Sequence, residues 1–343
     1  MNPIDYSEAD DRQDESAAIQ VSARGAAGER LDRFLTAQLS GSIDGLSRSR
    51  VQKWIALGAV SCGDRAISPS TRLDGFEILS VTPMPREADS AFEADPVSLT
   101  FVDEDSQILV IDKPAGMVVH PAPGNWRNTL LNGLLHHRPA QRDLPRAGIV
   151  HRLDKETSGL MVVARSERAL ASLVGQLADR SMSRRYLAVA AGHVPAVVEI
   201  DEPIGRDPRS RLRMAVVHGP SGKPARTTVT RLCEMRLGNQ AATLVECRLH
   251  SGRTHQIRVH LKHLGYPLIG DAVYGGPCES FSRQALHAWR LGLQDPLDGR
   301  PRHWISRPPP DLQALIAASG ADLTQIMHDL EQNAGNSMGS RGT

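Results

Sequence analysis

The chain has 343 residues, of which 40% are hydrophobic and 23% are charged, and its formal net charge is +1. This composition is typical of a soluble globular protein with room for two folded units, and it excludes fibrous and collagen-like chains. No apolar run approaches the roughly 18 residues that a membrane helix needs. The first residues also lack the basic and apolar regions of a secretory signal, so we expect a cytoplasmic protein that does not associate with membranes.

The small net charge conceals an uneven distribution along the chain. Residues 1–15 carry six acids against one arginine, whereas residues 205–265 carry twelve lysines and arginines against three acids. Basic segments of this density indicate a polyanionic partner, because each neutralised phosphate releases counterions and adds salt-dependent affinity. A solvated charged surface without a partner remains the alternative.

The N-terminal part of the chain predicts a small folded unit behind a disordered tail. Residues 1–27 are acidic or small and show no apolar period, so we expect them to be disordered. The next stretch, "ERLDRFLTAQL", places four apolar residues on one face of a helix. A second helix is expected to begin after Ser47, a good N-cap, and to end at Gly58. Short strands joined by Gly-Asp and Asp-Gly turns follow it.

Residues 28–83 resemble the S4 RNA-binding domain in three stretches, "RLDRFL", "SRSRVQKWIALGAVSCGDR" and "DGFEI". The resemblance implies a small α/β domain that binds RNA phosphates through the second helix, which carries Arg48, Arg50 and Lys53. A helical hairpin with an ordinary charged face is the alternative.

A larger domain is predicted to follow a linker. Prolines and mixed charge without a period indicate that residues 84–96 are the linker. Residues 97–325 combine strand patterns of the antiparallel type with a few helices, one of them over residues 254–265, and this mixture indicates an α+β domain. We expect residues 326–343 to be a flexible C-terminal tail.

Asp154 lies in a predicted loop directly before the apolar strand "GLMVVAR". Loops held by a rigid sheet are common positions for catalytic groups. Basic neighbours such as Arg152 and Lys155, or an arginine distant in sequence, favour the ionised carboxylate, which suits a nucleophile or a general base. A structural pair with Arg152 or a turn cap is the alternative.

Four stretches in the larger domain resemble the RluA-type pseudouridine synthases and occur in that family's order. They are "ILVIDKPAGMVVHP", "GIVHRLDKETSGLMVVAR", "RRYLAV" and "LHSGRTHQIRVHLKHLGYPLIGDAVYG", and they span about residues 100–292. The resemblance implies a mixed, mainly antiparallel catalytic sheet. It also implies an isomerase that converts uridines to pseudouridines in structured RNA. Large-subunit (23S) ribosomal RNA is the expected target, and transfer RNA, on which RluA-type enzymes also act, is the alternative. We expect no cofactor, no metal and a monomer.

The resemblance also assigns catalytic roles to particular residues. Asp154 is the expected catalytic aspartate, which attacks or deprotonates the ribose of a flipped-out uridine. Tyr186 is expected to stack on the base and is a candidate acceptor of the C5 proton, although a tyrosine in a strand is often a core residue. Arg258 is expected to pair with Asp154, and Arg253 is the rival for that position.

Three further residues are expected to act on the substrate or its surroundings. Extruding a uridine costs a few kcal/mol of stacking, and the planar guanidinium of Arg152 is suited to fill the gap that the base leaves. Ile257 is expected to line the pocket. His151 is expected to orient the loop that carries Asp154.

Other readings of these residues are weaker. Histidines at positions 250, 255, 260 and 263 could indicate a metal site, yet His255 and His260 do not share a helical face and no carboxylate completes the set. An aspartic protease or a glycosidase would need a second paired carboxylate, and none can be nominated. The remaining alternative is an RNA-binding protein that has this fold and does not modify RNA.

Overall fold

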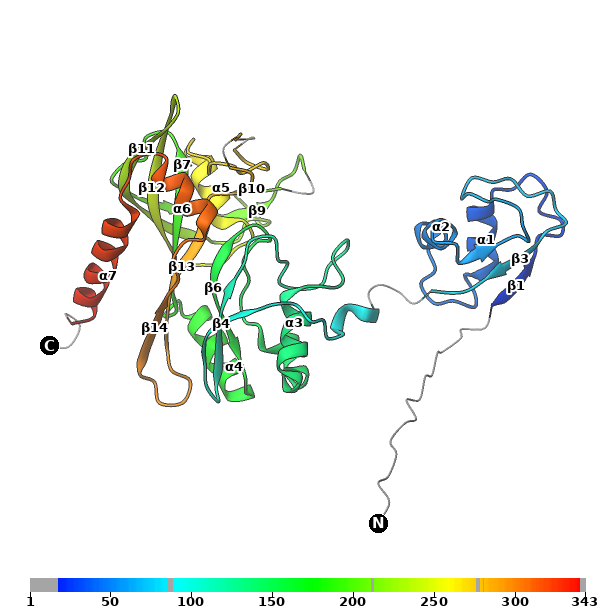
Figure 1. Cartoon of the computed structure of the whole chain (residues 1–343), viewed down its shortest axis with the longest axis horizontal. Helices are drawn as coiled ribbons and strands as arrows, with labels where there is room; N and C mark the ends of the chain where they lie inside the picture. The colour runs from blue at the N-terminus through cyan, green and yellow to red at the C-terminus, as the bar shows by residue number, and fades with distance from the viewer. Residues whose placement is uncertain (1–17, 85–88, 211–212, 276–277, 280, 340–343) are drawn as a thin grey trace, which may run out of the picture. The chain divides into compact units, whose positions relative to one another are not determined.

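The computed structural model describes residues 18–84, 89–210, 213–275, 278–279 and 281–339 (Figure 1). The chain divides into two compact units, residues 1–89 and residues 90–343. No helix within these described ranges is both long and apolar enough to span a membrane.

The small unit packs two helices on a three-stranded antiparallel sheet with the strand order β1-β3-β2. Its elements are β1 (Ile19–Ser22), α1 (Leu31–Leu39), α2 (Arg48–Ala56), β2 (Val60–Ser61) and β3 (Ile78–Val81). The predicted apolar stripe of α1 is buried, and the Ser47 side chain caps α2 by accepting a hydrogen bond from the Arg50 amide. Both helices were expected from the sequence.

The start of this unit lies earlier than the sequence indicated. Residues 1–17 of the expected tail lie outside the described residues. Strand β1 pairs with β3 along its whole length, and Val21, Ala23 and Ala26 are buried in the core. The predicted boundary at residue 28 is therefore wrong, because four residues of strand are too short to show a period in the sequence.

The large unit is built on a nine-stranded sheet with the order β4-β5-β6-β13-β7-β12-β11-β8, and β14 pairs with β13. Its strands are β4 (Thr100–Glu104), β5 (Ile108–Lys113), β6 (Ser158–Ala164), β7 (Ser183–Ala191), β8 (Val197–Asp201), β11 (Arg226–Leu237), β12 (Gln240–Leu249), β13 (Leu286–Gln294) and β14 (Pro301–Ile305). A separate antiparallel pair is formed by β9 (Ile204–Arg206) and β10 (Met214–Val216). Only the pairing of β6 with β13 is parallel within the described sheet. The predicted α+β class with a mainly antiparallel sheet is confirmed.

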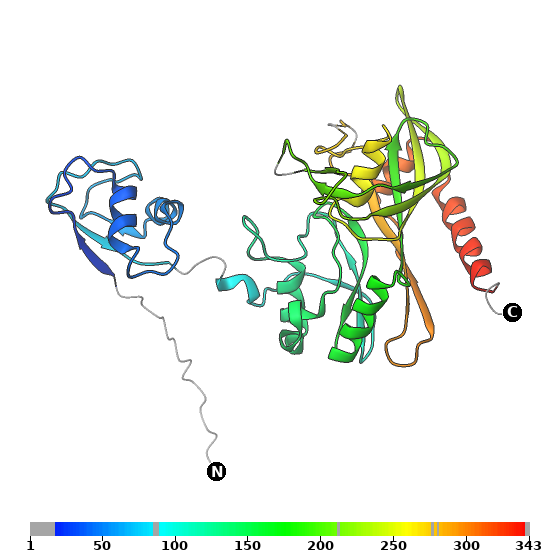
Figure 2. The same cartoon turned by 180° about the vertical axis from the view of Figure 1, so that it is seen from behind.

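Helices cover both faces of this sheet. They are α3 (Leu130–His137), α4 (Glu167–Ala178), α5 (Gln256–His263), α6 (Pro310–Ala317) and α7 (Leu323–Gly339), with short 3-10 turns η1 (Asp89–Phe92), η2 (Pro139–Asp143) and η3 (Pro145–Gly148). Alternation along β6 explains the two layers, since Met161 packs in the core with α3 and α5 whereas Leu160 packs with α4. Figures 1 and 2 show α5 and α6 on opposite faces of the sheet.

The predicted linker and the predicted flexible tail are both packed against the large unit over part of the residues that the structure describes. In the expected linker, residues 85–88 lie outside the described residues, but Ala91 is buried and the buried carboxylate of Asp95 bonds Arg127. In the expected C-terminal tail, residues 326–339 belong to α7, and Met327 is buried against Leu187 and Trp289. Both predictions were wrong over these residues, because the packing partners lie far away in the sequence.

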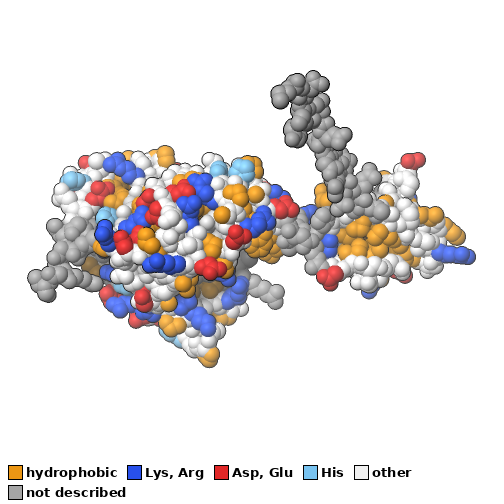
Figure 3. Space-filling view, turned by 90° about the horizontal axis from the view of Figure 1, so that it is seen from below, with side chains coloured by type: hydrophobic (Ala, Val, Ile, Leu, Met, Phe, Trp, Pro, Cys, Tyr) orange, Lys and Arg blue, Asp and Glu red, His pale blue; other side chains and the backbone are white. Residues whose placement is uncertain are grey.

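Basic and acidic side chains lie next to one another on the surface of the large unit. Basic and acidic side chains are interspersed on the face drawn in Figure 3. Arg302 illustrates the pairing, since its guanidinium contacts Asp103, Asp105 and Asp295. The near-neutral total charge thus reflects neutralisation within the fold as well as the acidic N-terminal residues.

Candidate active site

The loop that carries Asp154 is tied to the sheet at several points. The Asp154 carbonyl accepts a hydrogen bond from the Thr157 amide at 3.0 Å, and the Nε2 atom of His151 accepts one from the Val162 amide at 3.1 Å. Lys113, at the end of β5, is fully buried and donates to the carbonyl of Lys155 at 3.1 Å. These contacts fix the loop on the buried strand β6, so the direction of the Asp154 side chain is set by the sheet.

Lys113 is a structural anchor with an unusual environment. Its Nζ also donates to the carbonyls of Pro114 and Met117, at 2.7 and 3.0 Å. Burial lowers the pKa of Lys113 to about 7. Because three backbone carbonyls occupy its amine, Lys113 holds the loops around Asp154 and does not reach into the site.

Arg258 on α5 joins Asp154 to a second acid. Its Nη1 lies 3.1 Å from Oδ2 of Asp154, while its Nε and Nη2 bond the two carboxylate oxygens of Asp271 at 2.7 and 2.9 Å. Burial disfavours the charged guanidinium, but the two carboxylates outweigh it and raise the pKa of Arg258. No donor among the described residues bonds Oδ1 of Asp154, so one carboxylate oxygen is held and the other is open.

Asp271 was not predicted from the sequence. It is fully buried, and its Oδ1 also accepts hydrogen bonds from the amides of Val273 and Tyr274. The preceding Gly270 has φ +71°, and a Cβ there would lie 2.1 Å from the Arg283 carbonyl oxygen. The signal that could have identified Asp271 is the acid directly after a glycine in "PLIGDAVYG".

Asp154 opens onto a cavity of about 600 Å³ between the β7–β12 region of the sheet and α5. The predicted residues that line it are His151, Arg152, Asp154, Tyr186, Arg253, Ile257 and Arg258. Tyr186 is 5% exposed, and burial raises the pKa of its phenol. All seven candidates from the large unit are therefore brought together in one place.

The two arginines that the sequence left as rivals have different partners. Arg258 makes the ion pair with Asp154, whereas Nε of Arg253 donates to the Pro224 carbonyl at 3.3 Å. Arg253 still lines the cavity. The pairing therefore favours Arg258 over Arg253 as the partner of Asp154.

His255 is a member of the site that the sequence treated only as a metal-ligand candidate. The Tyr274 hydroxyl accepts a hydrogen bond from the Met214 amide at 2.8 Å and lies 2.8 Å from Nδ1 of His255, and we assign its own proton to the bond with Nδ1. Burial lowers the pKa of His255, although Asp154 opposes the shift. This assignment leaves the proton of a neutral ring on Nε2, which lies 4.0 Å from Oδ2 of Asp154.

Two of the other histidines considered as ligands, His250 and His260, have structural bonds. His260 contacts the Thr227 hydroxyl and the Glu202 carbonyl, each at 2.9 Å, and His250 contacts the Thr228 hydroxyl. Among the residues described, no group of three or more metal-binding side chains gathers in one place.

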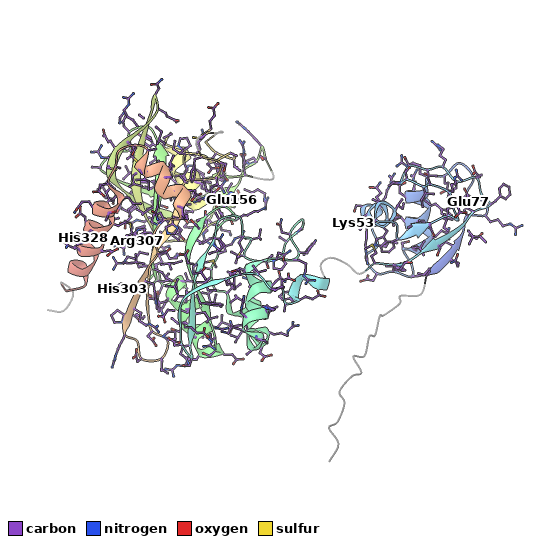
Figure 4. All side chains as sticks on the ribbon, viewed as in Figure 1. Lys53, Glu77, Glu156, His303, Arg307 and His328 are labelled. Atoms are coloured by element: carbon purple, nitrogen blue, oxygen red, sulfur yellow. The ribbon has the colours of Figure 1, made fainter. Side chains whose placement is uncertain are left out.

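The predicted RNA-binding residues of the small unit differ in how they are engaged. Arg48 bonds the fully buried carboxylate of Asp32 through Nε and Nη2, at 3.1 and 3.0 Å from Oδ2. Nη2 of Arg50 donates to the Met84 carbonyl at 2.7 Å. Lys53 is exposed on α2 (Figure 4). Two of the three basic side chains therefore also stabilise the small unit.

A held carboxylate in an arginine-lined cavity indicates an enzyme for an anionic substrate, and the comparisons with known proteins define its family. Residues 107–263 match the family model described as RNA pseudouridylate synthase. This chain belongs to that family, and it is an isomerase of the pseudouridine synthase type. The resemblance seen in the four sequence stretches is thereby confirmed.

Curated relatives cover most of the chain. The ribosomal large subunit pseudouridine synthase D of Neisseria meningitidis serogroup A is 47% identical over 85% of this chain and 79% of the relative. The protein of the same name in Escherichia coli K12 is 41% identical over 89% of this chain and 94% of the relative. Among solved structures, human RNA pseudouridylate synthase domain containing 1 matches 69% of this chain and 96% of its own, with 27% identity and a TM-score of 0.54.

Proposed function

We propose that this enzyme isomerises uridines in large-subunit (23S) ribosomal RNA, with Asp154 acting on a flipped-out nucleotide. The relatives named for the large ribosomal subunit support the choice of RNA. The observation that carries the assignment of Asp154 is its geometry. Arg258 holds Oδ2 at 3.1 Å and leaves Oδ1 open at the cavity.

The isomerisation breaks the bond between N1 of uracil and C1′ of ribose and forms one between C5 and C1′. In the course of it N1 gains a proton and C5 loses one. The open oxygen of Asp154 begins the reaction by attacking C1′ or by removing the proton from C2′. The ion pair with Arg258 holds the other oxygen of the carboxylate in place for either step.

The surrounding residues receive roles from their positions in the cavity. Tyr186 stacks on the released uracil, and the freed Asp154 carboxylate takes the C5 proton, because the raised pKa of Tyr186 keeps its hydroxyl protonated. Arg152, which is exposed at the cavity, occupies the gap left in the RNA stack. Ile257 forms an apolar wall, and neutral His151 orients the loop through the Val162 amide.

The test uses RNA tritiated at C5 of uridine. Wild-type enzyme is expected to release tritium, and Asp154→Asn is expected to release none above background while still binding the RNA. Equal release by the two proteins would overturn the assignment of Asp154. Mapping pseudouridine in ribosomal RNA from cells with and without the protein tests the substrate, and an unchanged map would exclude the large-subunit target.

We further propose that residues 19–84 form an S4-like RNA-binding unit and that residues 89–332 form the catalytic domain. Lys53→Glu probes the RNA-binding face, because Lys53 is exposed on α2. It is expected to weaken RNA binding and to reduce its salt dependence. Arg24→Glu, the same charge change outside α2, is the matched control, and equal effects of the two variants would contradict the assignment.

The place of action follows from the proposed substrate. An enzyme for ribosomal RNA works where ribosomal subunits assemble, so we assign it to the cytoplasm. We also propose that it acts as a monomer on its RNA. A dimer in sedimentation of the active enzyme would contradict the latter assignment.

A further inference from the structure

Arg184 is a buried cation at the cavity that the proposed mechanism does not use. It lies on β7 two residues before Tyr186, so both side chains project from the same face of the strand. It is 8% exposed and lines the cavity, and its Nε has no hydrogen-bond partner. Throughout the described residues, no hydrogen bond or ion pair includes its guanidinium.

An arginine in this state is costly to the free protein, because a buried charge is normally paired. Its partners across the sheet offer no compensation, since Leu249 and Leu291 stand opposite it on the neighbouring strands. Gly252 makes room for the guanidinium, because a Cβ there would lie 2.6 Å from Nη1 of Arg184. The position is therefore built to hold a cation at the cavity.

The charges around the cavity leave Arg184 without an internal anion. The charged side chains that line it are Arg146, Arg152, Asp154, Arg184, Arg253 and Arg258. The single carboxylate among them is Asp154, which is bonded to Arg258. An anion that enters with the substrate is the missing partner.

We propose, on the basis of the function proposed above, that Arg184 binds a phosphodiester group that flanks the target uridine. A guanidinium can donate two parallel hydrogen bonds to phosphate oxygens, and the buried setting strengthens them. The contact forms only when the nucleotide has left the RNA stack and entered the cavity. It thereby offsets part of the cost of extrusion and holds the ribose beside Asp154.

The adjacent arginine provides a contrast within the same strand. Arg185 projects from the opposite face of β7, and its Nη1 bonds Glu246 at 2.8 Å. Of these two consecutive arginines, Arg185 has a carboxylate partner within the described part of the protein and Arg184 does not. Arg185 is the matched control for every substitution at Arg184.

The test combines protein variants with RNA that lacks one backbone charge. An RNA that the wild type modifies is prepared with a neutral methylphosphonate linkage on the 5′ or the 3′ side of the target uridine. Arg184→Gln is expected to lower kcat/KM for the natural RNA by about 10- to 100-fold. One of the two neutral linkages is expected to lower kcat/KM of the wild type and of Arg185→Gln by a similar factor. The same linkage should not lower kcat/KM of Arg184→Gln any further.

Three results would overturn the proposal. The first is an Arg184→Gln enzyme that remains as sensitive to each neutral linkage as the wild type. The second is an Arg184→Gln enzyme whose turnover has a shifted pH dependence but which is still sensitive to the neutral linkages. That result would mean that Arg184 acts through the charge state of Tyr186. The third is a lower melting temperature for Arg184→Met, since loss of an unpaired buried cation is expected to leave the temperature unchanged or to raise it.

Discussion

Each of the two units buries a cluster of charges, and the clusters are organised in opposite ways. In the small unit the acid is at the centre. The carboxylate of Asp32 is fully buried and accepts hydrogen bonds from Gln52 at 2.6 Å, from Arg48 at 3.0 Å and from Arg30 at 3.1 Å. Both of its oxygens are occupied, so the cluster is closed.

In the large unit the base is at the centre. Arg258 is bonded to both oxygens of Asp271 and to one oxygen of Asp154, and the second oxygen of Asp154 faces the cavity. The comparison teaches that a buried ion cluster by itself does not indicate a catalytic site. What distinguishes the proposed catalytic cluster is one acceptor oxygen that the fold orients and leaves open.

The largest effect on turnover is expected at Asp154, the acid with one open oxygen. Asp154→Asn removes the attacking or accepting oxygen, and we expect turnover to fall by roughly 10⁴-fold. The melting temperature is expected to change little, because Arg258 keeps both bonds to Asp271. Single-turnover kinetics and thermal melting check the two parts, and a large loss of stability would show that the open acid is structural.

Asp32, whose two carboxylate oxygens are both occupied, is expected to matter for stability and not for turnover. Asp32→Asn leaves two half-exposed arginines without their anion, and we expect a loss of about 2–3 kcal/mol in the free energy of unfolding of the small unit. Asp74→Asn, which breaks an exposed pair with Arg65, is the control and should cost about 0.5 kcal/mol or less. Denaturant unfolding measures both, and equal values would contradict the importance of the buried cluster.

The closed cluster also predicts a pH dependence. Burial opposes ionisation of Asp32, but hydrogen bonds from Arg30, Gln52 and Arg48 outweigh it and hold its pKa below the usual range. The stabilisation is therefore present above about pH 4, the ordinary pKa of an aspartate, and is lost as the pH falls through the lowered folded-state pKa. Asp32→Asn should lack this acid-dependent part of the unfolding curve.

A smaller effect on activity is expected at Asp271, the acid that holds Arg258. Asp271→Asn weakens the bidentate bond to Arg258, and we expect activity to fall about 10- to 30-fold through misplacement of Asp154. Asp295→Asn, which weakens the Arg302 pair away from the cavity, is the control for lost stability without lost activity. Measuring kcat and melting for both variants separates the two, and full activity of Asp271→Asn would contradict a positioning role.

The smallest effect is expected from the group that orients His255. Tyr274→Phe removes the hydroxyl that bonds Nδ1 of His255 and the Met214 amide, and we expect a loss of about 3- to 10-fold in activity. Nitrogen NMR shifts of the His255 ring should show that the proton no longer favours Nε2. Tyr266→Phe serves as the control, and an unchanged ring spectrum in Tyr274→Phe would contradict the proposed tautomer.

The sequence was most informative where function is concentrated in contiguous motifs. Asp154, Tyr186 and Arg258 could be nominated because each lies in a stretch that resembles the family. Asp271 and Tyr274 lie in the last of those stretches, but no periodicity indicates that they bond α5. Such contacts depend on how distant segments pack, which local pattern does not report.

The element boundaries were least predictable at the ends of each unit. The strand over residues 19–22 is too short to reveal its period, and α7 is ordered through its contact with Leu187 and Trp289. Both segments are stabilised by tertiary contacts and not by strong local preference. The helices found from sequence were those with a clear local signal, such as α1 with its apolar stripe and α2 with its Ser47 cap.

The parallel pairing of β13 with β6 also affects when the proposed active site can form. β13 lies between β6, which follows Asp154, and β7, which carries Tyr186, and it contacts them at His287–Ser158 and Leu286–Ala188. These pairings close loops of about a hundred residues or more, which makes them slow to form. We therefore expect the β6 and β7 sides of the proposed active site to stay apart during synthesis until the chain beyond residue 286 has emerged, and a shorter nascent chain to be inactive.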